Sequence, residues 1–93
     1  MRNLPFAENL RLARTARRMS RSTLANDSGV SRRALVANEL HGAVPGIDRV
    51  SWLAQVLGVD PGELAFMDTV TFRARLVERG TAEDDLALVP RRR

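Results

Sequence analysis

The sequence contains no cysteine, tyrosine or lysine, and it has a single histidine, His41. Without cysteine, the chain can form no disulfide and no cysteine-ligated zinc or iron–sulfur site. One histidine cannot build a metal cluster, so we expect no metal and no other cofactor. Aromatic residues make up only 4 % of the chain. The core must therefore consist mainly of leucine, valine and alanine, which favours helices over an aromatic-rich β-sandwich.

Long apolar runs are also missing. No segment approaches the roughly 20 consecutive apolar residues that a membrane span requires, and no hydrophobic signal-peptide region follows Met1. We therefore expect a soluble, cytoplasmic protein with no membrane partner. A chain of 93 residues has the length of one domain with a short tail.

Arginine supplies all of the strong positive charge, and its distribution is uneven. Residues 1–49 contain nine arginines against four acidic residues, whereas residues 50–90 contain three against seven. Three further arginines, Arg91 to Arg93, follow. A concentrated basic region favours a polyanionic partner, and the alternative is a solvated charged surface. The use of arginine alone also suits a GC-rich genome and is not by itself a functional signal.

Apolar residues that recur at intervals of three and four predict a series of helices. Ser20 and Ser31 are suited to cap the second and third helices, and Gly29 can end the second in a left-handed conformation. Val30 is expected to enter the core from this turn, and Trp52 to anchor the core from the fourth helix. The predicted helices span residues 4–18, 21–28, 32–40, 47–57 and 61–66.

The pattern changes at residues 69–77, where apolar and polar side chains alternate in TVTFRARLV. A period of two predicts a β-strand. A lone strand cannot satisfy its own backbone, so it needs a partner strand. Two partners remain open: residues 86–89 of the same chain, or residues 69–77 of a second copy in a homodimer.

Two serine-capped helices joined by a short glycine turn are typical of the helix-turn-helix motif. In that motif, the second helix enters the major groove of DNA with its N-terminal residues at the base edges. Free N–H groups at the two helix starts bind phosphate oxygens, and long donors just after the caps reach the DNA. Arg21, Arg32 and Arg33 occupy such positions.

Residues 6–66 resemble the phage-repressor, Cro-like helix-turn-helix (XRE) family. The resemblance covers about two-thirds of the chain and depends on several elements in register. These are Arg14 seven residues before Arg21, S-x-x-x-L-A at 20–25, G-V-S-R at 29–32, Glu39, Pro45 and I-x-x-V-x-x-L-A-x-x-L-G-V at 47–59. The resemblance implies an all-α, five-helix, lambda-repressor-like domain over residues 1–67, with a C-terminal extension over residues 68–93 that contains the predicted strand.

The same resemblance implies residue roles. Arg21 is expected to contact phosphate, whereas Arg32 and Arg33 are expected to read bases, because arginine binds guanine through O6 and N7. Val36 and Ala37 occupy later groove-facing positions, and Val36 could meet a thymine methyl. The full set of expected DNA-binding residues is Arg2, Ser20, Arg21, Ser22, Ser31, Arg32, Arg33, Val36, Ala37 and His41.

Arg14 and Glu39 are implied to form a structural ion pair between the first helix and the recognition helix. Three positions depart from the family pattern. Asn38 replaces a bulky apolar residue, Arg18 replaces a glycine before the second helix, and His41 replaces a glycine or asparagine. Gly42 is suited to take over the left-handed turn that His41 disfavours.

The sequence favours a sequence-specific double-stranded DNA-binding transcriptional regulator of the repressor or Cro type, acting on an operator. The alternative is an antitoxin or anti-repressor module that acts mainly through protein–protein contacts, which the acidic second half permits. An enzyme has no support, because no catalytic cluster accompanies any acidic residue. No group of polar residues suggests a small-molecule ligand.

Overall fold

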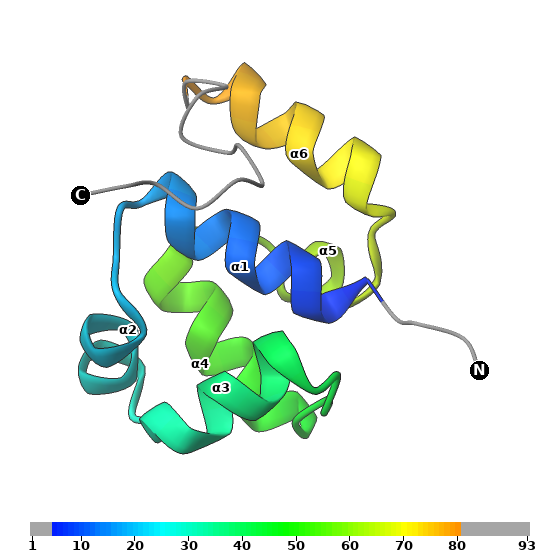
Figure 1. Cartoon of the computed structure of the whole chain (residues 1–93). Coiled ribbons are helices and arrows are strands. Elements are labelled where there is room, and N and C mark those ends of the chain that lie inside the picture. The colour runs from blue at the N-terminus through cyan, green and yellow to red at the C-terminus, as the bar shows by residue number, and fades with distance from the viewer. Residues whose placement is uncertain (1–4, 81–93) are drawn as a thin grey trace.

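The computed structural model describes residues 5–80, and every regular element within this range is a helix (Figure 1). The helices follow one another with short connections. They are α1 (Phe6–Ala16), α2 (Arg21–Ser28), α3 (Arg32–Leu40), α4 (Ile47–Leu57), α5 (Pro61–Phe66) and α6 (Thr69–Glu78). The all-α class predicted from the sequence is confirmed for this part of the chain.

Helix α1 lies at the centre of the packing, between α3 on one side and α6 on the other (Figure 1). It also packs against α5, while α2 packs on α3 and α4. Each of the six helices contributes to one apolar core, whose most deeply buried side chains are Phe6, Leu10, Leu12, Leu24, Leu35, Leu53, Leu64 and Phe72. The core therefore includes α6 and does not end with the five predicted helices.

The β-strand predicted for residues 69–77 is wrong, because this segment forms α6. Phe72 and Leu76, four residues apart, are buried against the core, whereas Val70 is 76 % exposed. Residues four apart share one face of a strand and also one face of a helix, so the alternating pattern fits both structures. The Asp68 carboxylate also caps α6 by accepting hydrogen bonds from the Thr71 backbone N–H and hydroxyl.

Strand pairing through residues 69–77 cannot build a dimer, because these residues form α6. A helix satisfies its own backbone hydrogen bonds, so α6 presents no strand edge to a second copy. The other predicted pairing partner, residues 86–89, lies outside the described residues.

The expectation that Trp52 anchors the core is also wrong, because this side chain is 47 % exposed. The buried stripe of α4 is formed by Val50, Leu53, Ala54 and Leu57. Trp52 is two residues from Val50, which places it on the opposite face of the helix. The apolar pattern of α4 is wider than the face that the other helices cover.

The three positions that depart from the family pattern, Arg18, Asn38 and His41, lie at the C-terminal ends of α1 and α3. Arg18 adopts a positive φ of 57°, in the left-handed region where a glycine would be unstrained. Gly42 has a φ of 75°, as predicted. Asn38 is buried and its amide donates a hydrogen bond to the Ala43 carbonyl at 2.8 Å, so it supports the chain as it leaves α3.

Asn9, on α1, is a buried polar residue that the sequence gives no reason to single out. Its side chain is fully buried. The Nδ2 amide donates to the carbonyl oxygens of Leu64 at 3.2 Å and Met67 at 2.8 Å, and it lies 3.3 Å from the Glu63 carbonyl. These carbonyls belong to the last turn of α5 and its exit, where a helix leaves acceptors without internal partners. Asn9 therefore joins α1 to the α5–α6 junction.

Within residues 5–80, no helix combines the length and the apolar character that crossing a bilayer would require.

Candidate nucleic-acid interface

Helices α2 and α3 are joined by only three residues, 29–31, and both ends of this connection are fixed by local interactions. Gly29 ends α2 in the left-handed region, with a φ of 82°. Ser31 caps α3, because its Oγ accepts a hydrogen bond from the Ala34 N–H at 3.1 Å. Between them, Val30 is 2 % exposed and packs into the core. The turn therefore sets a fixed relation between the two helices.

Helix α3 has an inward and an outward face. Leu35 and Asn38 are buried, whereas Arg32 and Arg33 are exposed at its first turn. Residues at i, i+3, i+4 and i+7 lie on one face of a helix. Arg33, Val36, Ala37 and Leu40 therefore share the outward face, which carries a long cation followed by smaller side chains.

Leu40 was not among the residues predicted for this surface. Its side chain is 59 % exposed at the end of α3, although leucine is more often buried. The signal was available in the sequence, since Leu40 follows Arg33 by seven residues, two turns of a helix. The family resemblance implies DNA contacts for earlier positions of this helix and none for Leu40.

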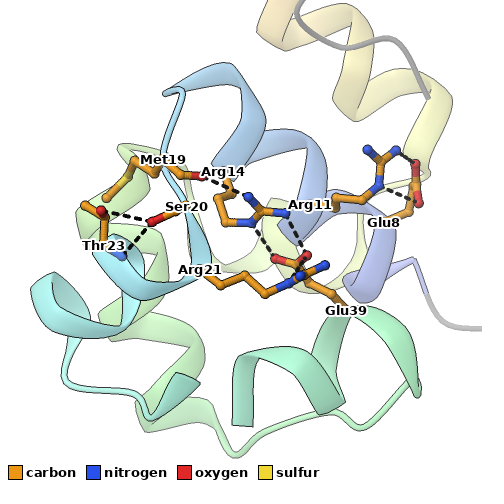
Figure 2. Close-up of polar contacts among 8 residues, drawn as sticks. All are labelled: Glu8, Arg11, Arg14, Met19, Ser20, Arg21, Thr23 and Glu39. Atoms are coloured by element: carbon orange, nitrogen blue, oxygen red, sulfur yellow. Dashed lines mark hydrogen bonds and ion pairs between the residues drawn. The ribbon is translucent and has the colours of Figure 1, made fainter. Parts of the chain in front are cut away.

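The predicted serines are placed at the helix starts. Ser20, Ser22 and Ser31 are exposed, and the Ser20 Oγ accepts a hydrogen bond from the Thr23 N–H at 3.0 Å (Figure 2). His41 is exposed at the opposite end of α3, a full helix length from Ser31. The predicted contact Arg2 lies outside the described residues.

The expected ion pair between Arg14 and Glu39 is present and has bidentate geometry (Figure 2). Arg14 Nε lies 2.8 Å from Glu39 Oε2, and Arg14 Nη2 lies 2.9 Å from Oε1. Arg14 Nη1 donates to the Met19 carbonyl at 2.8 Å. All three guanidinium nitrogens of Arg14 are therefore bonded, and the arginine joins α1 to α3 and to the approach to α2.

Arg21 belongs to the same cluster, which the sequence did not predict. Its Nε donates to Glu39 Oε1 at 3.0 Å, so the carboxylate lies between two arginines (Figure 2). The Glu39 side chain is 0 % exposed, whereas Arg14 is 15 % and Arg21 is 27 % exposed. The cluster of Arg14, Arg21 and Glu39 carries one net positive charge, and Arg21 is its outermost member.

The chemistry that these residues offer is donation of hydrogen bonds to anions and to base edges. Arg32 and Arg33 are exposed, planar, permanently charged donors, and such groups bind phosphate and guanine bidentately. No group of three or more histidine, aspartate or glutamate side chains is arranged to hold a metal ion in the part of the chain that the structure describes.

Comparison with protein-family models, with curated proteins and with solved structures gives no significant match.

Proposed function

We propose that the protein is a sequence-specific double-stranded DNA-binding transcriptional regulator, of the repressor or Cro type, which places α3 in the major groove. In this proposal, α2 and α3 form a helix-turn-helix unit of a lambda-repressor-like domain. Arg32 and Arg33 read guanines, Val36 and Ala37 approach the groove floor, and Ser20, Arg21, Ser22 and Ser31 grip the phosphate backbone.

One observation carries the proposal: the division of α3 into two faces. Leu35 fixes the inner face to the core with 0 % exposure, while Arg32 and Arg33 are exposed at the N-terminal end of the same helix. The N-terminal turn of a recognition helix is the part that reaches base edges. Half-buried, small side chains then follow at Val36 and Ala37, which allows a close approach to the groove.

A paired arginine variant tests the proposal. Arg32→Ala/Arg33→Ala is expected to weaken binding at least about 30-fold to a duplex that the wild type enriches from a random pool, because two guanine contacts of roughly 1–3 kcal/mol each amount to at least about 2 kcal/mol. Binding is measured by fluorescence anisotropy at two salt concentrations. Base preference should also relax at the contacted positions.

The matched control is Arg75→Ala/Arg79→Ala, which removes the same charge from α6 and its C-cap, where both arginines pair with Glu63. This helix lies across α1 from α3 (Figure 1). The control is expected to bind nearly as well as the wild type and to keep its base preference. Equal losses in the two double variants, with no change in preference, would show that the α3 arginines add only general positive charge.

Exposed apolar side chains favour a second candidate, an antitoxin or anti-repressor module that acts mainly through another protein. Phe66 and Val70, either side of the α5–α6 junction, are 73 % and 76 % exposed. Exposed apolar residues in close succession are typical of protein contacts. Under this candidate, Phe66→Ser/Val70→Ser abolishes partner binding and leaves DNA binding unchanged.

A further inference from the structure

The ion cluster divides its two arginines into different roles. Arg14 donates hydrogen bonds from all three of its nitrogens, to Glu39 and to the Met19 carbonyl. Arg21 uses Nε alone, for Glu39. Neither Nη1 nor Nη2 of Arg21 donates a hydrogen bond to any residue in the described range. Four of the five N–H donors of this guanidinium are therefore available to an outside acceptor.

We infer that Glu39 is a positioning residue for DNA, which holds the Arg21 guanidinium in the orientation that grips a backbone phosphate. This inference rests on the proposed function and assigns Glu39 a role beyond the structural pair with Arg14. A guanidinium can bond a carboxylate through Nε and still present its Nη groups to an anion, because the five donors lie in one rigid plane.

The cluster also explains why an arginine can be held at this position. Arg21 is the first residue of α2, where the helix dipole disfavours a cation, and it shares a carboxylate with a second cation, Arg14. The fully buried carboxylate of Glu39 offsets both effects and fixes the side chain at Nε. Fixing a flexible side chain before binding lowers the entropic cost of making the phosphate contact.

Replacing Glu39 with glutamine distinguishes positioning of Arg21 from a simple effect of charge, because the two predict opposite changes in DNA affinity. Glu39→Gln raises the net charge from +4 to +5. If Glu39 acted on DNA only through its charge, this variant would bind DNA more tightly. Glu8→Gln is the control for this effect of charge, because it removes the carboxylate partner of Arg11 and should bind DNA more tightly. If Glu39 positions Arg21, the variant binds more weakly despite its added positive charge.

The experiment is a double-mutant cycle measured by anisotropy on the duplex enriched by the wild type. Glu39→Gln is expected to weaken binding several-fold in the wild-type background and to have no weakening effect in an Arg21→Gln background. Arg21→Gln itself should weaken binding about tenfold, similarly for all sequences. Circular dichroism at the assay temperature establishes that each variant is folded.

Arg21→Lys tests the positioning role of Glu39 independently, because this variant leaves the Arg14–Glu39 pair in place. Lysine keeps the charge but has no Nε–H and no planar fork, so it cannot bond Glu39 and a phosphate in the same arrangement. It is expected to lose about as much affinity as Arg21→Gln. Wild-type affinity in Arg21→Lys, or an equal effect of Glu39→Gln in both backgrounds, would overturn the inference. If the wild type bound no duplex, the proposed function itself would fail instead.

Discussion

Glu39→Ala is expected to lower the free energy of unfolding by about 3–5 kcal/mol, measured by urea denaturation at pH 7. The carboxylate has 0 % exposure and accepts three hydrogen bonds from two arginines. Its removal leaves Arg14, at 15 % exposure, beside Arg21 with no intervening negative charge. Domains of this size have a total stability of about 5–15 kcal/mol, so the loss is a large share of it.

Glu8→Ala is the control, because Glu8 also pairs with an arginine, Arg11, but on the surface of α1. The side chains of this pair are 40 % and 22 % exposed. Surface pairs contribute about 1 kcal/mol or less, so Glu8→Ala should have a small effect. If the two alanine variants lost similar stability, the burial of Glu39 between the arginines would not account for its contribution to the free energy of unfolding.

Asn9→Asp is expected to destabilise the fold by at least about 3 kcal/mol at pH 7, with a penalty that depends on pH. The Asn9 amide is fully buried and donates towards three carbonyl oxygens. A carboxylate there would face acceptors without donating to them. Burial and the carbonyls would raise the pKa of the introduced carboxyl in the folded protein above its unfolded value of about 3.9.

Because the pKa of the introduced carboxyl is higher in the folded state, the stability of Asn9→Asp relative to the wild type should fall as the pH rises. Since the unfolded state ionises first, the penalty relative to the wild type should begin near pH 4. It should then grow by about 1.4 kcal/mol per pH unit until the folded-state pKa is reached. Denaturation of wild type and variant at several values between pH 4 and pH 7 measures the difference. The control Asn26→Asp changes an exposed residue of α2 and should stay within about 0.5 kcal/mol. A pH-independent difference for Asn9→Asp would contradict the assigned hydrogen bonds.

The ends of α2 and α3 were predictable because local chemistry decides them, whereas the first helix was predicted over residues 4–18 and α1 spans Phe6–Ala16. Ser20 and Ser31 cap α2 and α3, and Gly29 ends α2 in the left-handed region, as predicted. The Arg14–Glu39 pair was foreseen from the family resemblance, although the partners are 25 residues apart. Side chains that interact with their own turn leave a signal in a single sequence, and family patterns extend it to a few distant pairs.

The features that the sequence did not predict depend on tertiary contacts. The segment 69–77 fits a strand period and a helix period at once, and burial of Phe72 and Leu76 against the core decides for the helix. Asn9 could not be singled out, because its carbonyl partners lie more than 50 residues away and any polar residue on α1 reads as surface. The Arg21–Glu39 contact was missed because the pairing rule assigned Glu39 one partner only.

The most direct test of the proposed function is selection of bound sites from random duplex DNA by the wild-type chain, repeated at two salt concentrations. The proposal predicts an enriched motif that contains guanines and persists at the higher salt, since base contacts carry specificity beyond the salt-dependent phosphate contacts. Twofold symmetry in that motif would indicate two copies on each site. A bound pool with no enriched motif would contradict the proposed function.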